Sequence, residues 1–327
     1  NVSKDTTKKT LTDRAYFKYI LPYSDYWKLI NGNYIDPCAY DSSFSAVINM
    51  DLENGIDFYS ARDKKISTLL NQVYEDWNFS DSEKAFWLDR ISSVTIPYEY
   101  GYHTGWEMLF SCLELFAIGM IGICICVSGT FSGEYQSGAD SIILSSRYGK
   151  SKLLTAKILA AFAYSFFLFT LFLLVGCGIL LAGFGMDGWE LPVQVLNTIS
   201  PYDLSLAGAA VTAVGTLYLI LAGMVSFTLL LSAKMRSAVS VLVIIVLAFM
   251  LPMFIGISET NGIWNRIFVL LPYRAAQTVF SDDFYGYFGY PIGGLTFDVV
   301  TVRMLLYAAV TLICVPFARK AWKGHQV

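Results

Sequence analysis

Five apolar runs in the second part of the chain are each long enough to cross a lipid bilayer as a helix. A spanning helix needs about 20 predominantly apolar residues. The predicted spans are, in chain order, residues 106–128, 154–183, 205–231, 238–257 and 302–318. Tryptophans stand near the ends of several runs, where an aromatic belt at the membrane surface would place them. The pattern predicts an all-α integral membrane protein, a polytopic helical bundle.

The first 104 residues have a different pattern, in which apolar positions recur at the spacing of amphipathic helices. One such face is formed by Ile66, Leu69, Leu70, Val73 and Trp77. Ser80 and Glu83 form a capping-box pair, which predicts the start of another helix. We therefore expect a mostly helical polar domain at residues 1–104 and a transmembrane domain at residues 105–327.

Composition supports this division and excludes several functions. The chain is 55% hydrophobic and only 15% charged, whereas about 25% of residues are charged in ordinary soluble domains. A net charge of −3 and the lack of a long basic run speak against a nucleic-acid partner. The cysteines and histidines lack the spacing of a zinc site. We predict no metal site, no cofactor site and no catalytic residue, and therefore a protein that is not an enzyme.

Charge in the short connections predicts the orientation, because cytoplasmic loops carry an excess of Lys and Arg. The 128–154 and 232–237 connections and the C-terminal tail are basic, whereas 184–204 is acidic and contains no Lys or Arg. The C-terminus is therefore expected in the cytoplasm and residues 1–104 outside the cell. Something must carry that domain across the membrane. We expect a further N-terminal span, which makes six spans in the intact protein; a cleaved signal peptide is the alternative.

The polar connection from Phe131 to Lys157 contains a short apolar stretch at Ile142, Ile143 and Leu144. A short helix there, on the cytoplasmic side, could dock into a groove on a soluble partner. The other interpretation is a solvated loop whose charges only fix the topology. Gly149-Lys150-Ser151 ends like a phosphate-binding loop, but the glycine required five residues earlier is replaced by a leucine. Nucleotide binding by this chain is not expected.

This connection resembles the corresponding segment of ABC-2 (type-two ABC exporter) permeases. The matching features are Glu134, Gly138, the apolar and serine stretch 142–146, Arg147 and Lys157. In that family the segment, here 131–153, contacts a separate subunit that binds ATP and Mg²⁺. The resemblance implies that the coupling residues are Phe131, Glu134, Gly138, Ile142, Ile143 and Arg147. It also implies ATP-binding cassette subunits, a second or homologous permease copy and the lipid bilayer as partners.

Two further features lie within or beside the predicted spans. Glu114 lies about two turns into the first span, on the same face as Glu107. It is a candidate for a substrate path; pairing with a neighbouring helix, or reaching back to the outer surface, is the alternative. Gly208, Gly215 and Ala222 recur every seven residues and predict a close helix–helix contact.

Residues 258–301 are too long for a simple turn, yet their apolar run is too short to cross and is broken by Pro272. We expect a re-entrant or interfacial region, and the resemblance implies paired short helices at this place, before the last span.

The predicted function is that of a permease subunit of an ATP-driven exporter in a bacterial plasma membrane. Its large outer region is similar to that of Gram-positive members that act in peptide-antibiotic export and self-immunity. The expected load is amphipathic: an antimicrobial peptide, an antibiotic or a lipid-like molecule. The alternative from another class is a membrane-anchored sensor with an extracellular ligand-binding domain. Such a sensor would need a cytoplasmic signalling domain.

Overall fold

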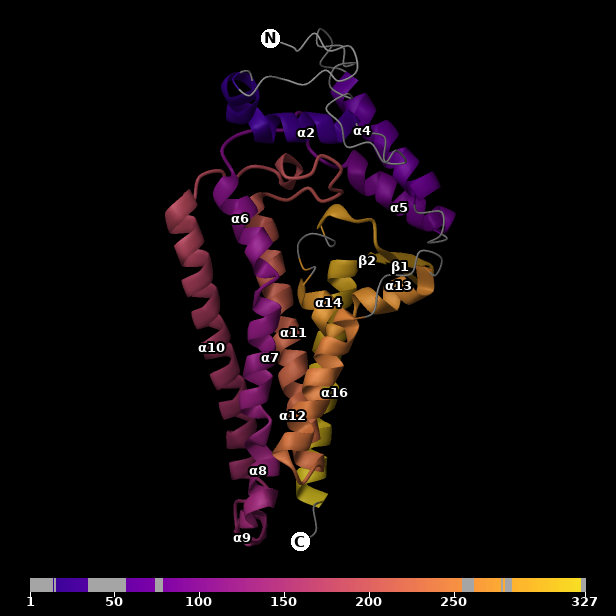
Figure 1. Cartoon of the computed structure of the whole chain (residues 1–327). Coiled ribbons are helices and arrows are strands. Elements are labelled where there is room, and N and C mark those ends of the chain that lie inside the picture. Colours follow the sequence, from indigo (N-terminus) through magenta and orange to yellow (C-terminus); the bar gives the residue numbers. More distant parts are fainter. Residues whose placement is uncertain are drawn as a thin grey trace.

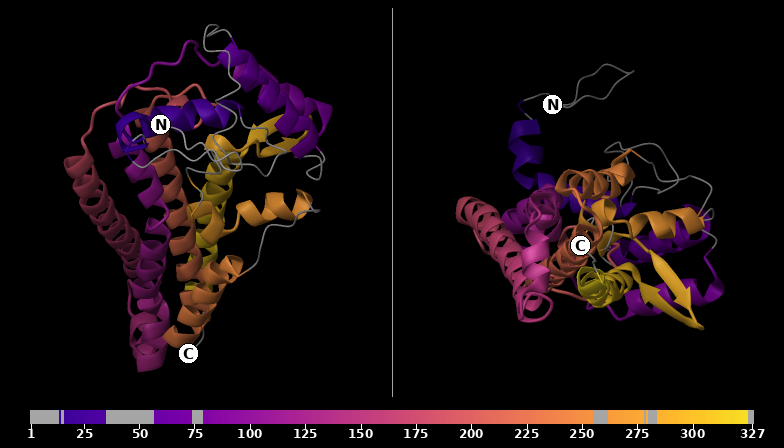
Figure 2. Two further views of the ribbon diagram at one scale, coloured as in Figure 1. Left: turned by 45° about the horizontal axis from the view of Figure 1, so that its top comes forward. Right: turned by 90° about the horizontal axis from the view of Figure 1, so that it is seen from below.

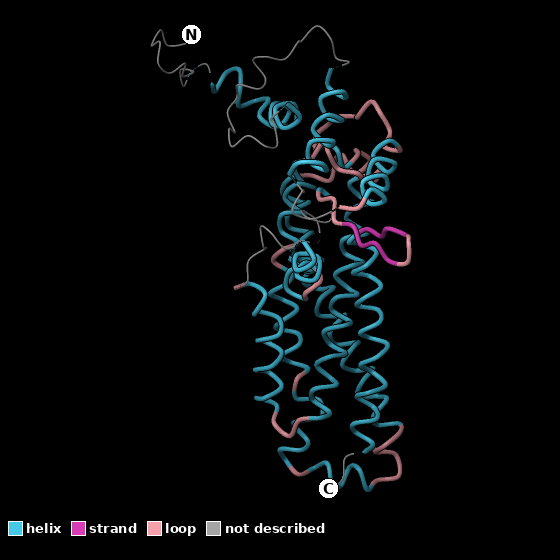
Figure 3. The backbone as a smooth tube through the Cα atoms, turned by 90° about the vertical axis from the view of Figure 1, so that its right-hand side faces the viewer, coloured by secondary structure: helices cyan, strands magenta, loops and turns pink. Residues whose placement is uncertain are grey.

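In the described part of the chain, four long apolar helices run side by side (Figures 1 and 3). The computed structural model describes residues 14, 16–34, 57–73, 79–254, 262–277, 279 and 284–324. The helices long and apolar enough to cross a membrane are Thr104–Ser137, Lys152–Phe184, Leu206–Lys234 and Val299–Gly324. They coincide with four of the five predicted spans. The remaining run is a shorter apolar helix, α12 (Ala238–Met250), continued by η6 (Leu251–Met253).

The first spanning helix contains two interruptions of its hydrogen-bond ladder. It consists of α6 (Thr104–Leu113), α7 (Phe116–Val127) and α8 (Gly129–Ser137). In the first turn of α8, the backbone N–H groups of Phe131 and Ser132 both donate to the Ser232 hydroxyl of the third spanning helix, at 3.0 Å each. A side chain inserted into the ladder in this way is a recognised cause of helix bending.

The third spanning helix, α11 (Leu206–Lys234), is the centre of the bundle, and α10 (Lys152–Phe184) lies at its edge (Figure 1). In its most apolar window 61% of α11 is buried, compared with 11% of α10. The chief neighbour of α11 is α16 (Val299–Gly324). A Cβ on Gly223 would lie 2.7 Å from the Tyr307 ring, whereas nothing lies within 4 Å of one on Gly215. The close contact between α11 and α16 is therefore at Gly223, which was not among the predicted residues Gly208, Gly215 and Ala222.

A helical cap covers one end of the bundle (Figures 1 and 2). It includes η1 (Tyr16–Ile20), η2 (Leu21–Tyr23), α2 (Ser24–Tyr34), α4 (Asp57–Thr68), η3 (Leu69–Val73) and α5 (Asp81–Ser92). The predicted capping box of Ser80 and Glu83 is confirmed, with both reciprocal hydrogen bonds present. A small core joins α4, η3 and α5 to a later segment: Ile66, Leu69, Leu70, Trp87, Ile91 and Tyr287. Val73 lies beside it at a position whose side chain is not described, and Trp77 lies outside the described residues.

The segment before the last span completes the cap. It contains α13 (Gly262–Val269), α14 (Pro272–Gln277) and the antiparallel strands β1 (Gly289–Ile292) and β2 (Leu295–Asp298). The fold is therefore mostly helical rather than all-α. A signal for the hairpin was present, because Gly293 and Gly294 form its two-residue turn with φ of 61° and 87°, and paired glycines favour such turns. The connection before α11 contains η5 (Val193–Val195).

Two ion pairs fasten these late segments to α5. Arg266 of α13 donates to Glu83 at 2.7 Å, and Arg90 donates to Asp298 at the end of β2, also at 2.7 Å. Both acidic side chains are at most 6% exposed. The cap is thus assembled from segments that are about 180 to 210 residues apart in the sequence.

Candidate functional site

The segment predicted to couple the chain to a partner forms the other end of the bundle, here called the α9 end (Figure 1). It comprises α8 and α9 (Ala139–Ser145), separated by Gly138 in the left-handed region at φ 69°. That backbone conformation suits glycine because it carries no Cβ. Gly138 therefore provides the turn that lets α9 leave the line of α8.

An aromatic cluster anchors α8 to the end of α16. The Trp322 ring lies 5.0 Å from that of Phe131 and stacks on that of Tyr135 at 5.4 Å, between centroids. Trp322 and Phe131 are both completely buried. The indole N–H of Trp322 donates to the Gly149 carbonyl at 3.3 Å, so the cluster also holds the loop after α9. A Cβ on Gly149 would collide with the Ile143 carbonyl, so this loop packs tightly against α9.

Glu134 forms an ion pair with Lys157 of α10. Lys157 also donates to the Thr130 carbonyl at 3.2 Å and lies 5.6 Å above the Trp322 ring. The side chains of Glu134 and Lys157 are only about a fifth exposed, at 20% and 19%. The second carboxylate oxygen of Glu134 is buried and makes no hydrogen bond within the described part of the chain. Glu134 therefore points inward and links α8 to α10.

The tip of α9 presents a different surface. Ile142 is 75% exposed, while Leu144 is buried and Ile143 packs partly against the core. Arg147 is exposed next to the helix, with its guanidinium 5.3 Å above the ring of Tyr148, which is itself exposed. The tip thus combines one exposed aliphatic side chain with a cation and an aromatic ring.

The six predicted coupling residues therefore fall into two groups. Phe131, Glu134 and Ile143 face the bundle, whereas Ile142 and Arg147 face outward, with Gly138 at the turn between them. Sequence reasoning did not find Trp322 or Ser232 as partners of this segment. Their contacts span about 100 to 190 residues, and no local pattern indicates them.

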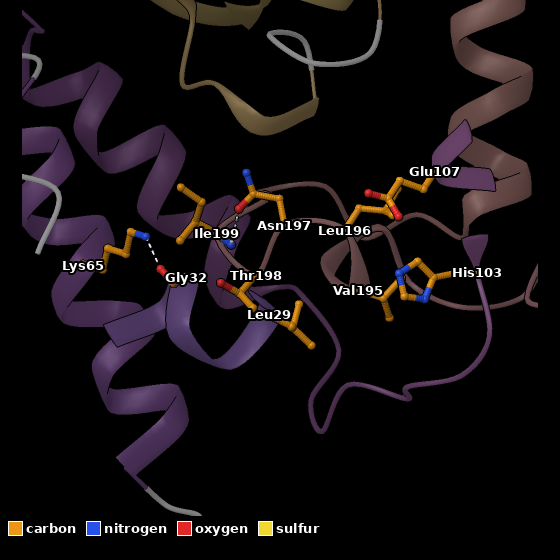
Figure 4. Close-up of a pocket in the computed structure, with 10 residues that line it drawn as sticks. All are labelled: Leu29, Gly32, Lys65, His103, Glu107, Val195, Leu196, Asn197, Thr198 and Ile199. Carbon is orange, nitrogen blue, oxygen red and sulfur yellow. Dashed lines mark hydrogen bonds between the residues drawn. The ribbon is translucent and has the colours of Figure 1, made fainter. Parts of the chain in front are cut away.

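A cavity of about 300 Å³ lies at the cap end (Figure 4). Its lining combines α2, α4, α6 and the loop before α11: Leu29, Gly32, Lys65, His103, Glu107, Val195, Leu196, Asn197, Thr198 and Ile199. Lys65 lies on one side, where its ammonium donates to the Gly32 carbonyl, and Glu107 and His103 lie on the other. Burial lowers the pKa of Lys65. The cavity therefore has a cation on one side and a carboxylate on the other, with apolar side chains and the polar Asn197 and Thr198 between them.

The two acidic residues of the first span occupy different surroundings. Glu107 lines the cap cavity. Burial of the Tyr285 phenol, together with the negative charge of Glu107, raises the pKa of Tyr285. Glu114 stands at the break between α6 and α7, where its side chain is exposed at the surface of the chain. The role of Glu114 in a substrate path stays a prediction, and the cavity adds Glu107 as a candidate.

Comparison with known proteins identifies the family. A profile described as "ABC-2 family transporter protein" matches residues 8–315. No curated protein matches the chain, and no solved structure does. Among the described residues, no group of acidic residues, histidines and cysteines could hold a metal ion. Because the match covers most of the chain, this protein belongs to the ABC-2 transporter family, as a multi-pass membrane permease that serves as a transport subunit.

Proposed function

We propose that the chain exports an amphipathic molecule, such as a peptide, an antibiotic or a lipid-like compound, with energy from separate ATP-binding cassette subunits that bind ATP and Mg²⁺. Two permease copies, or this chain and a homologous permease, form the transport unit. The cap faces outside and the α9 end faces the cytoplasm of a bacterial cell. The basic connections at the α9 end support this orientation, because Lys and Arg concentrate in cytoplasmic loops.

The observation that carries the proposal is the exposed Ile142 on a short helix that is fixed to the bundle. An aliphatic side chain that is 75% exposed beside a cation suits insertion into an apolar pocket of a partner. Nucleotide binding that draws the ATPase subunits together would push first on α9. The turn at Gly138 then passes the displacement to α8.

From α8 the displacement reaches three other spanning helices through direct side-chain contacts. Trp322 connects α8 to α16, Lys157 connects it to α10 and Ser232 connects it to α11. These contacts lie within or beside closely packed parts of the bundle, which would transmit the displacement because a close-packed interior is not easily compressed. In this proposal Glu134 connects α8 to α10 inside the permease, and Ile142 and Arg147 contact the ATPase subunit.

The cap cavity supports an amphipathic load. Its apolar residues would receive the apolar part of a substrate, and Lys65 and Glu107 would interact with charged groups at its ends. Its position at the cap end fits the release or capture of the substrate on the outer side.

Exchanging the charges of the Glu134–Lys157 pair tests whether this ion pair connects α8 to α10 during coupling. Glu134→Lys places two cations together, and we expect loss of ATPase-coupled transport in vesicles that contain permease and ATPase subunits. The double variant Glu134→Lys with Lys157→Glu restores opposite charges and should recover most of the activity. If the double variant stays inactive while both proteins still form the complex, Glu134 contacts the ATPase directly and the internal role is wrong.

Ile142→Asn tests the docking contact itself. We expect the ATPase subunit to co-purify at least about tenfold less, because a hot-spot side chain contributes about 2 kcal/mol or more. Ile263→Asn on α13 is the matched control, since Ile263 is 71% exposed at the cap end. Equal recovery of the ATPase subunit with both variants would remove α9 as the docking element.

A further inference from the structure

A basic pocket lies on the flank of the bundle between the start of α10 and the end of α16. Its volume is about 550 Å³. The residues that line it are Ser151, Lys152, Leu154, Thr155, Ala156, Leu159, Arg319 and Lys323. It contains three cations and no carboxylate. Neither the docking role of α9 nor the cap cavity involves these residues.

The three cations have no anionic partner within the described part of the chain. Arg319 and Lys323 make no ion pair there, and Lys152 contacts only the Tyr148 ring, at 4.9 Å. Arg319 is half-buried, and its Nε is buried without a hydrogen bond to any described residue. A buried donor without an acceptor is costly, so an anionic oxygen at this point would be stabilising.

Local structure fixes the cations around the pocket. Arg319 and Lys323 are one turn apart on α16 and therefore share a face. Trp322, which lies between them in the sequence, is completely buried, and its indole N–H donates to the Gly149 carbonyl. This hydrogen bond holds the end of α16 against the loop that leads into α10. The pocket also receives the N-terminal end of α10, where the partial positive charge of a 33-residue helix adds to that of Lys152.

The apolar part of the lining indicates what kind of anion fits. Leu159 lies seven residues after Lys152 on α10, about 10 Å further along the helix axis, and it is 62% exposed. Leu154 forms the buried floor. A cationic group at the end of a spanning helix, followed by exposed aliphatic surface, matches a phosphate headgroup followed by an acyl chain.

We propose that this pocket binds the phosphate headgroup of an anionic phospholipid, with its acyl chain along α10. The ligand would hold the start of α10 against the end of α16, next to the Trp322 anchor of the coupling segment. Bound lipid therefore stabilises the α9 end.

Thermal unfolding of the purified full chain in neutral detergent tests the proposal. Added phosphatidylglycerol should raise the unfolding temperature more than phosphatidylcholine or inorganic phosphate. The double variant Arg319→Gln with Lys323→Gln should bind phosphatidylglycerol roughly twentyfold more weakly, because each basic group near an anionic lipid contributes several-fold. The control double variant, Lys234→Gln with Arg236→Gln, removes two exposed cations that do not line the pocket and should bind normally.

Three results would overturn the lipid site. Equal binding by all variants would mean that the interaction is not localised here. Stabilisation by inorganic phosphate alone, to the same extent, would identify a free-anion site. Normal lipid binding with loss of the ATPase subunit from the complex would identify a protein interface. If the double variant does not fold, Lys152→Gln offers the same comparison from the opposite wall of the pocket.

Discussion

At the cap end, segments that are far apart in the sequence are joined by charge. Glu83 pairs with Arg266, and Arg90 pairs with Asp298, each at 2.7 Å. At the α9 end the main joint is aromatic, with Trp322 packed on Phe131 and Tyr135. An ion pair is present there too, but it lies beside the aromatic cluster, with Lys157 above the Trp322 ring.

The difference follows from what each end has to hold. The cap joins short helices and a hairpin around a small apolar core, and directional charged contacts fix the register of these segments. At the α9 end, long helices meet over a continuous apolar core, and a large ring fills the space between their ends. We therefore expect the α9 end to respond most to changes of volume and the cap end to changes of charge.

Trp322→Ala should have the largest effect. Removing a completely buried indole leaves a cavity between α8 and α16, at a cost of about 3–5 kcal/mol in unfolding free energy. Denaturant titration in mild detergent measures the loss. Trp189→Ala is the matched control, because Trp189 is 56% exposed and its removal should cost little. Similar losses in the two variants would mean that Trp322 does not anchor this end.

Glu83→Gln should have the next largest effect, at the cap. Glutamine still serves in a capping box, so the substitution isolates the charge of the pair with Arg266. Leaving a mostly buried guanidinium without its carboxylate costs about 3 kcal/mol. Protease cleavage of the cap should become faster while the bundle stays intact. Asp81→Asn, an exposed change on the same helix turn, is the control, and equal cleavage of both variants would contradict a charge-locked cap.

The spans and the capping box could be predicted because each depends on residues close together in the sequence. Apolar run length predicted four helices of spanning length. In the 238–257 run the described helix reaches Met253, and residues 255–257 lie outside the described residues. The hairpin was missed although Gly293-Gly294 indicated it, because the apolar context favoured an interfacial helical region.

The side-chain contacts of the candidate site could not be predicted from patterns of neighbouring residues in the sequence. Glu134 was predicted as a coupling residue from the family resemblance, but its partner Lys157 and the direction in which it points depend on how α8 lies against α10. In the same way, nothing near Trp322 indicates that it meets Phe131, 191 residues earlier in the chain. Such pairs are decided by helix packing, which a single sequence specifies only weakly.

Acidification should destabilise the cap end more than the α9 end. The effect should be smaller than those above, and it depends on Asp298. Burial by itself would raise the pKa of this carboxyl, but hydrogen bonds from Thr301 and the charge of Arg90 outweigh burial and hold the pKa below its ordinary value. The folded protein thus binds this proton less tightly than the unfolded chain does. The resulting stability is present above the ordinary pKa of about 4 and is lost as the pH falls through the lower, folded pKa.

Thermal unfolding between pH 6 and pH 3 measures this contribution. At pH 6 we expect Asp298→Asn to cost about 1.5 kcal/mol, the contribution of a hydrogen bond to a charged group. The difference from the unmodified chain should shrink towards pH 3, because protonation removes the same charge. Asp89→Asn, next to Arg90 and exposed, should leave the pH profile unchanged. A gap that stays constant down to pH 3 would show that Asp298 acts by packing or by capping α16, and that charge does not hold this corner of the cap.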